Sequence, residues 1–516
     1  MTVAPIDGPN VWHELSGGMP ELYTYDQLDR YYTGRQPLAF LPPEIQRATM
    51  GRLRPLIINW PRLVIDSLEE RLDVEGFRLA SDQPADASLW GIWQANNLDE
   101  WSQQCHIEAL LHGRAYVLVW ADELDERMPR ISVESTAQMR VEFAPGTSRI
   151  TRAIKQWVED DLTYSTVYYP DSVWRYVAET TALGGELTMN QAAWQLREDP
   201  LPHDLGVVPV VPFVNRPRLT RPLGESELID VIPLADAVNK LATDMMVTSE
   251  YHAVKRRWAT GLEIPEAAGS RERLQEQVAQ EWDRATSDKT WLGGKGVTFG
   301  QFSEASLDNF TNAINLLSGH IAALSGLPPH YLGLSTDGNP ASADAIRSSE
   351  ASLVKRAERK QRVFGGAWER VMRLALQVQD PNLPAGAESM ETIWRDPETP
   401  TVAQKVDAAQ KLNAMGLPFR QSLEDLGYTP TQIARIREMN VEDSIADTRA
   451  QLAAADEVME KHGLSRAAAL AVVGLSEAAD IQAKVEAHEV APPSTTPVRK
   501  TIERDAAGNI AAIVEG

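Results

Sequence analysis

Cysteine is almost absent from this sequence, since Cys105 is the only one among 516 residues. A single thiol excludes internal disulfides and any zinc site built from several cysteines. Its neighbour is His106, and on a helix adjacent side chains point about 100° apart. We therefore expect Cys105 to be a buried structural residue and not a nucleophile.

Basic charge is also scarce, because 50 Lys and Arg stand against 73 Asp and Glu, for a net charge of −23. A domain that reads DNA sequence normally carries a basic surface that neutralises phosphates, so this balance argues against that class of protein. Strong acidity keeps a large protein in solution by self-repulsion. It says nothing about the fold.

Long apolar runs are missing. No stretch reaches the roughly 18 consecutive apolar residues of a membrane-spanning helix, and polar residues interrupt the nearest approach, 307–327. The first residues lack the basic and then apolar segments of a signal peptide. We expect a soluble protein that is made and used in a cytoplasm.

Recognisable catalytic motifs are absent too. The nine histidines are scattered without a His-Glu-x-x-His, and there is no Gly-x-Ser-x-Gly elbow. The run 293–296, Gly-Gly-Lys-Gly, lacks the Ser or Thr of a phosphate-binding loop and reads as a hairpin tip. No compact carboxylate set demands metals. We predict no catalytic residue, no metal and no cofactor.

The hydrophobic fraction of 43% is ample for buried cores. The length of the chain favours roughly three or four domains. Helices are expected over 22–32, 43–72 with a break at Pro61, and 89–111. Short β-branched or aromatic stretches then predict strands at 115–120, 130–133, 139–143, 150–158, 163–169 and 173–178. Helices followed by a run of strands suggest an α+β domain.

The rest of the chain is mainly helical. The stretch 206–215 contains two prolines and is expected at a sheet edge. Helices are expected over 225–258 with Pro233 as a kink, over 307–324, over 340–379 with a bend at Gly365-Gly366, and through most of 397–490. The residues after Val490 are linker-like.

A short loop at 326–339 separates two of these helices. It reads Gly-Leu-Pro-Pro-His-Tyr-Leu-Gly-Leu-Ser-Thr-Asp-Gly-Asn, and its prolines and glycines interrupt regular structure. The helices on both sides are long enough to hold it in place. The pattern indicates a loop presented at the junction of two helices.

One basic segment stands out in this acidic chain. Its residues are Lys355, Arg356, Arg359, Lys360 and Arg362, opposed only by Glu358. Two interpretations remain open: a solvated helix face, or pairing with an acidic surface of a neighbouring subunit.

The order of these features resembles the portal proteins of tailed bacteriophages. The resemblance is carried by 208–215, by 224–228 through 244–246, and above all by 326–333 running into 339–347. It implies a mostly helical α+β fold with wing, stem, clip and crown, assembled as a ring of about twelve subunits. The implied parts are a wing portion (1–222), first stem helix (223–260), clip (261–303), second stem helix (304–325), tunnel loop (326–339), bent wing helix (340–396), crown (397–490) and flexible tail (491–516).

The same resemblance implies function and partners. The ring would stand at one capsid vertex of the virion after assembly in the host cytoplasm, and would pass double-stranded DNA. It would bind the packaging terminase, a head-tail adaptor and the capsid or scaffolding protein. Tunnel-loop candidates for DNA contact are His330, Tyr331, Ser335, Thr336, Asp337 and Asn339; clip candidates for docking are Lys289, Trp291 and Lys295.

The charge balance agrees with a conduit for DNA, because each retained phosphate contact would slow sliding. Two other classes remain as alternatives. One is a metal-dependent nuclease or hydrolase with helical modules, and the other is a ring-forming adaptor without a DNA passage.

Overall fold

The structure of the protein is a computed structural model. It describes residues 23–37, 56–79, 85–122, 127–147, 149–179, 194–253, 257–260, 298–301, 306–334, 343–398, 402–415, 421–423, 430–440, 500–504 and 510–515, with isolated positions between them. The chain divides into two compact units, Met1–Gln410 and Lys411–Gly516.

The first helices begin at well-formed caps. Helix α2 (Tyr25–Thr33) starts at Thr24 with a capping box and ends at Gly34. Helix α4 (Trp60–Glu69) has Pro61 in its first turn. Residues 56–59 before it are not helical, so the expected break near Pro61 is confirmed, and proline is tolerated at the helix start because the amide donor it removes has no partner there anyway.

The expected helix over 89–111 is two helices, α5 (Ala87–Ala95) and α6 (Leu98–His112). They separate at Asn97, whose φ of 51° is left-handed. Cys105 lies on α6 and is completely buried, as predicted, and burial raises the pKa of its thiol.

The predicted strands are confirmed almost residue by residue. Strands β4 (Met139–Phe143), β5 (Ile150–Glu159), β6 (Leu162–Tyr168) and β7 (Ser172–Glu179) form an antiparallel meander, which the short strands β8 (Gln195–Leu196) and β9 (Leu201–Pro202) extend. Their β-branched and aromatic composition, with turn residues between the runs, is what predicts these strands.

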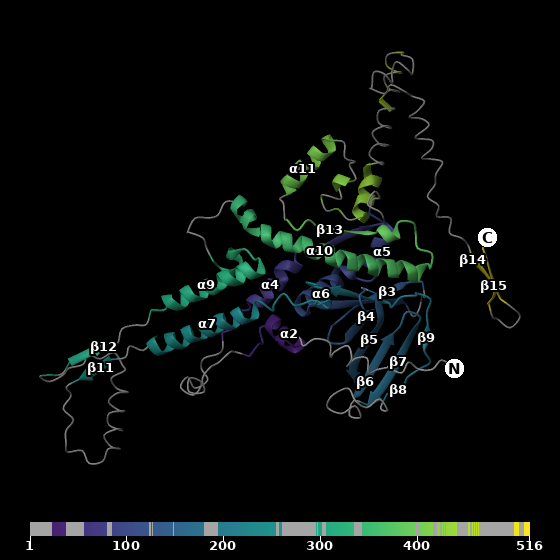
Figure 1. Cartoon of the computed structure of the whole chain (residues 1–516). Helices are drawn as coiled ribbons and strands as arrows, with labels where there is room; N and C mark the ends of the chain where they lie inside the picture. Colours follow the sequence, from purple (N-terminus) through teal and green to yellow (C-terminus); the bar gives the residue numbers. More distant parts are fainter. Residues whose placement is uncertain are drawn as a thin grey trace. The chain divides into compact units, whose positions relative to one another are not determined.

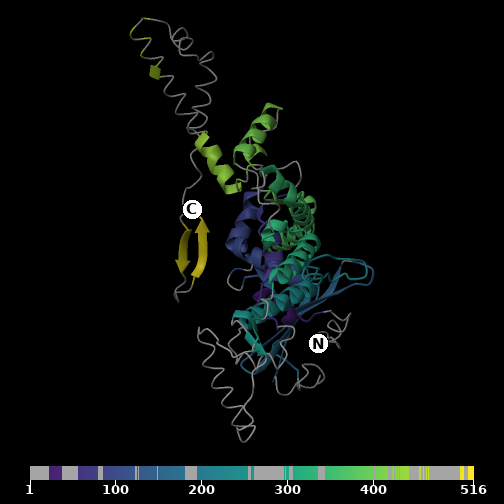
Figure 2. The same cartoon turned by 90° about the vertical axis from the view of Figure 1, so that its left-hand side faces the viewer.

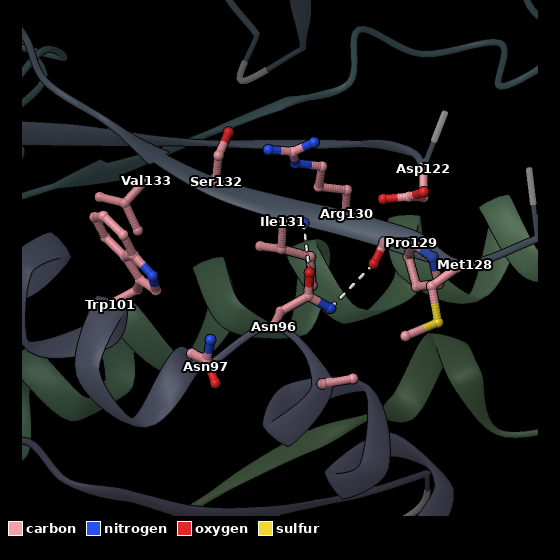
Figure 3. Close-up of a pocket in the computed structure, with 11 residues that line it drawn as sticks. Asn96, Asn97, Trp101, Asp122, Met128, Pro129, Arg130, Ile131, Ser132 and Val133 are labelled. Atoms are coloured by element: carbon pink, nitrogen blue, oxygen red, sulfur yellow. Dashed lines mark hydrogen bonds between the residues drawn. The ribbon is translucent and has the colours of Figure 1, made fainter. Parts of the chain in front are cut away.

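A second sheet has the order β10-β2-β3, from strands Val210–Val214, Arg114–Ala121 and Pro129–Glu134. The predicted edge position of β10 is confirmed. At the opposite edge, the Asn96 amide donates to the Pro129 carbonyl at 3.0 Å and accepts from the Ile131 amide at 2.9 Å, beside a hollow of about 350 Å³ (Figure 3). Asn96 thus takes the place of a strand partner and protects the edge of β3.

Two helices lie side by side, with a short sheet at their far end (Figure 1). They are α7 (Ile232–Ala253) and α9 (Asp308–Ser325), and the sheet pairs β11 (Arg257–Thr260) with β12 (Thr298–Gln301). Helix α7 is shorter than the expected 225–258, because Pro233 lies in its first turn and Trp258 belongs to β11. The prediction of α9 is confirmed.

The longest helix, α10 (Ala343–Gln379), stays helical through Gly365-Gly366. A Cβ on Gly365 would lie 3.0 Å from the Trp394 indole nitrogen, so glycine there permits close packing of β13 (Glu391–Trp394). Strand β13 pairs with β1 (Val74–Arg78), a pairing that the sequence did not reveal.

An aromatic cluster fills the core beneath α10. Trp368 stacks edge-on against Trp93 and Phe213, and its indole N–H donates to Nε2 of His106 at 2.9 Å. His106 is completely buried, and desolvation lowers its pKa to about 3. The imidazole is therefore neutral in the folded protein.

A buried ion pair ties α10 to the turn before α7. The Lys360 ammonium lies 2.5 Å from a Glu227 carboxylate oxygen and also donates to Asn215, at the end of β10. Burial opposes ionisation of Glu227, but the Lys360 charge and its hydrogen bonds outweigh burial and hold the pKa of Glu227 below its ordinary value.

The turn itself is built around Gly224. It has a φ of 77°, and a Cβ there would lie 2.3 Å from the Asn215 carbonyl oxygen. No other residue fits without displacing the backbone.

In the chain's last part, α11 (Val402–Ala414) confirms a predicted helix, and residues 430–440 are also helical. Strands β14 (Lys500–Arg504) and β15 (Ile510–Glu515) form an antiparallel pair (Figure 2). Their composition, which reads as a loosely held tail, did not predict this pairing. Of the other expected C-terminal helices, 444–462 and 465–487 lie almost entirely outside the described residues.

Breaking the buried ion pair should destabilise the fold. Lys360→Met leaves Glu227 buried and unpaired, and we expect a loss of about 3–5 kcal/mol in the free energy of unfolding, measured by denaturant titration. The matched control is Lys240→Met, because Lys240 pairs with Asp244 at the surface and its loss should cost less than about 1 kcal/mol. Equal costs for the two variants would contradict the prediction.

His106 should make stability depend on pH. Its native pKa of about 3 lies below the ordinary value of 6.5, so the unfolded chain binds the proton first. The contribution of neutral His106 to the free energy of unfolding is fully present above pH 6.5. It is lost as the pH decreases, by roughly 3 kcal/mol at pH 4.

His106→Gln keeps an acceptor for Trp368 but cannot titrate. We expect a flatter profile of unfolding free energy between pH 7 and 4. His112 is present in both proteins, so its contribution is the same in the two profiles. Parallel profiles would show that His106 does not cause the loss.

Candidate functional site

The paired helices α7 and α9 meet through small or β-branched side chains. On α7 the buried residues include Ala235, Val238 and Ala242, and on α9 they are Ser318, Ile321, Ala322 and Ser325. The hydroxyls of Ser318 and Ser325 each donate to a carbonyl four residues earlier, at 2.6 Å. Satisfied hydroxyls can be buried at a close helix contact without loss.

The other face of α9 carries apolar side chains that the subunit does not cover. Leu316 is 63% exposed and Leu324 is 49% exposed, with exposed His320 between them at a spacing of four residues. That spacing puts the three side chains on one stripe of the helix. Exposed apolar stripes of this kind mark protein contact surfaces.

The end of α9 depends on Gly326 and Arg356. Gly326 has a φ of 72°, and a Cβ there would lie 2.5 Å from Nε of Arg356. Arg356 donates to the carbonyl of Leu324 at 2.7 Å and so caps the helix. The glycine supplies both the left-handed turn and room for the guanidinium.

The loop begins from a short 3₁₀ helix, η4 (Pro329–Leu332), anchored by buried Leu327 and Leu332. His330 is exposed, whereas the neighbouring Tyr331 hydroxyl donates to Glu350 of α10 at 3.1 Å. Burial raises the pKa of Tyr331, which stays a neutral donor. Of the predicted loop residues, His330 is thus free to face outward and Tyr331 is engaged within the subunit.

Arg71 joins both ends of the loop. Its guanidinium lies 3.4 Å from the Tyr331 hydroxyl and 3.4 Å from Glu350, and it donates to the Pro397 carbonyl at 2.5 Å. We call Arg71, Tyr331 and Glu350 the loop latch. One partly buried cation thereby contacts both the first half of the loop and the helix after it.

Several sequence-predicted site residues lie outside the described part of the chain. They are Ser335, Thr336, Asp337 and Asn339 of the loop and Lys289, Trp291 and Lys295 of the insert. Their roles stay predictions.

The basic segment of α10 separates into two groups. Arg356 and Lys360 make the intrachain contacts described above. Lys355, Arg359 and Arg362 are exposed, and among the described residues none of them has an ion-pair partner. Their spacing of four and three residues aligns them as an exposed basic stripe.

Sequence reasoning missed Arg71, Glu227 and Glu350. The ion pairs Lys360–Glu227 and Arg71–Glu350 join residues 133 and 279 positions apart in the chain, and no local pattern marks such pairs. Within the described residues no helix is long and apolar enough to cross a membrane, and no group of three or more His, Cys, Asp or Glu could hold a metal ion.

Comparison with known proteins identifies relatives over most of this architecture. Residues 18–443 match the family described as phage portal protein, SPP1 Gp6-like. The portal protein of Mycobacterium phage L5 is 36% identical over 402 residues, which cover 75% of this chain and 79% of the relative. The portal protein of Mycobacterium phage D29 is 35% identical over 402 residues, which cover 75% of this chain and 79% of the relative.

Solved structures with a similar chain include necks of gene transfer agent (GTA) particles. One is the neck of an empty particle with C6 symmetry, with a TM-score of 0.43 and 13% identity over 83% of this chain and 100% of that chain. Another is the neck of a native particle with C12 symmetry, with a TM-score of 0.41 and 12% identity over 82% and 99%.

The family match over 18–443 includes α7, α9, the loop latch and α10, and the two mycobacteriophage relatives each match over 75% of the chain. The chain therefore belongs to the phage portal proteins, the structural family whose known role is to form the DNA channel of the virion.

Proposed function

We propose that copies of this chain assemble into a closed ring, of about twelve subunits, around the DNA channel at one capsid vertex. The observation that carries the ring is the exposed stripe of Leu316, His320 and Leu324 on α9. A helix that packs its small residues on α7 and leaves leucines outside needs another covering surface. Neighbouring copies supply it.

The exposed basic stripe of α10 supports the same arrangement. Lys355, Arg359 and Arg362 have no partner within the described subunit, while the chain carries a net charge of −23. A neighbouring copy offers abundant carboxylates, so contact between copies neutralises charge on both sides. This proposal gives the exposed part of the basic segment an inter-subunit role.

In this ring α7 and α9 are the stem, and 326–339 is the tunnel loop that touches DNA without reading it. Of the DNA-contact candidates in the loop, His330 is described and exposed. An imidazole ring can donate and accept hydrogen bonds, and an acidic wall does not retain phosphates. The chain then guides DNA and catalyses no reaction of its own.

The remaining parts are assigned to partners. The insert 261–303 is the clip, where Lys289, Trp291 and Lys295 dock the packaging terminase and later the head-tail adaptor. Residues 397–490 form the crown, and the wing meets the capsid or scaffolding protein. Assembly takes place in the host cytoplasm, and the mature ring resides in the virion.

Charging the apolar stripe should prevent assembly without unfolding the subunit. For Leu316→Glu we expect loss of ring species in mass photometry, with the thermal melting profile of the subunit unchanged. Leu196→Glu is the matched control, because Leu196 is also exposed, at 43%, but lies on β8. Normal rings from Leu316→Glu would refute the stripe as an interface.

Shortening the loop separates a DNA channel from an adaptor ring. Deletion of 335–338 leaves the latch residues in place, so we expect rings to form normally while DNA packaged per particle falls at least about tenfold. The measurement is nuclease-protected DNA in particles that carry the variant. Unchanged packaging would favour an adaptor role, and packaging lost together with the ring would show that the loop is structural.

A further inference from the structure

The first unit contains a groove that the proposed stem contacts do not use. It has a volume of about 1480 Å³ and lies among α10, β10 and the turn between β4 and β5. Apolar side chains left exposed in it include Val207 at 46%, Val363 at 40% and Leu383 at 40%. Small-molecule sites are usually about 300–1,000 Å³, so the groove suits a polypeptide segment better.

The groove also holds positive charge that the subunit compensates only in part, through Glu369. Arg149 and Arg370 are exposed in it, and neither has an ion-pair partner among the described residues. Arg373 donates only to the carbonyls of Ala387 and Glu388, at 3.4 and 3.3 Å. Desolvation and then the charge of Arg373 lower the pKa of Arg370, with Glu369 opposing them in part. An acidic and partly apolar segment would match this lining.

Such a segment exists on the same chain, at the turn between β5 and β6. Val158 is 55% exposed there, followed by exposed Glu159, Asp160 and Asp161. Asp160 and Asp161 have φ values of 48° and 64° in a two-residue hairpin turn, so the backbone is already ordered. Among the described residues none of the three carboxylates has an ion-pair partner. We call Val158, Glu159, Asp160 and Asp161 the acidic tip.

The acidic tip cannot reach the groove of its own chain. Strand β5 starts at Ile150, which lines the groove, and ends at Glu159. Nine residue steps of extended strand span about 30 Å. The occupant must therefore come from another molecule, and a second copy of this chain carries the fitting chemistry.

We infer that in the ring the acidic tip of each subunit sits in the groove of the next, with its carboxylates against Arg149, Arg370 and Arg373 and Val158 on the apolar wall. This rests on the proposed ring. Because tip and groove are different surfaces, the contact is head-to-tail, the kind that closes into rings when the rotation permits.

Charge exchange tests the contact. Glu159→Arg and Arg370→Glu should each raise the protein concentration for half-maximal ring assembly roughly tenfold or more, and the double variant should recover most of the loss. Arg127→Glu, an exposed reversal outside the groove, is the control. Circular dichroism checks the fold of each variant. Normal assembly of both single variants, or no recovery in the double variant, would overturn the inference.

Cysteine pairing tests the direction of the contact. Val158→Cys with Val207→Cys should give a ladder of oxidised oligomers, while each single variant stays uncrosslinked because Cys105 is buried. Crosslinking by Val158→Cys alone would mean that two tips meet, which the inference excludes. If wild-type protein forms no rings at all, the proposed function fails; if it forms rings without this crosslink, only the present inference fails.

Discussion

The structure depends on one constraint, which is that the buried charges of Lys360 and Glu227 must stay together. Neither can be left alone in the core without a cost of several kcal/mol. Asn215 accepts from the same ammonium and donates to the Glu225 carbonyl at 2.8 Å, so it belongs to this cluster. The end of β10, the turn before α7 and the middle of α10 thus meet at one point, and the direction of α7 is set there.

Helix α10 makes contacts with different parts of the fold at successive points along its length. Near its start Glu350 belongs to the loop latch, a turn or two later Arg356 caps α9, and further along Trp368 fills the aromatic core. Its opposite side carries the exposed basic stripe. A single helix therefore couples the loop, α9 and the aromatic core, and each of these contacts restricts the others.

Much of the fold could be predicted from the sequence, because the strands of the meander are short β-branched or aromatic runs between turn residues and the long helices repeat apolar residues at helical spacing. The sequence-based predictions are wrong where a residue fits two different local structures. Pro233 lies in the first turn of a helix, although a proline in a helical pattern can equally kink one. The sequence pattern predicts one continuous basic surface, but the Lys360 side chain points into the core. The burial of Lys360 depends on its ion pair with Glu227, which is distant in the sequence, and residue spacing cannot reveal that pair.

The pairing of β11 with β12 has a consequence for how such a channel can change. The two strands bring the ends of the insert together at Thr260 and Thr298, beyond the tips of α7 and α9. Once a loop is closed, doubling its length costs only about 0.6 kcal/mol of closure entropy. Insertions, deletions or exchange of the segment between these strands should therefore cost α7 and α9 little stability, so this segment can change its length and surface while the paired helices stay the same.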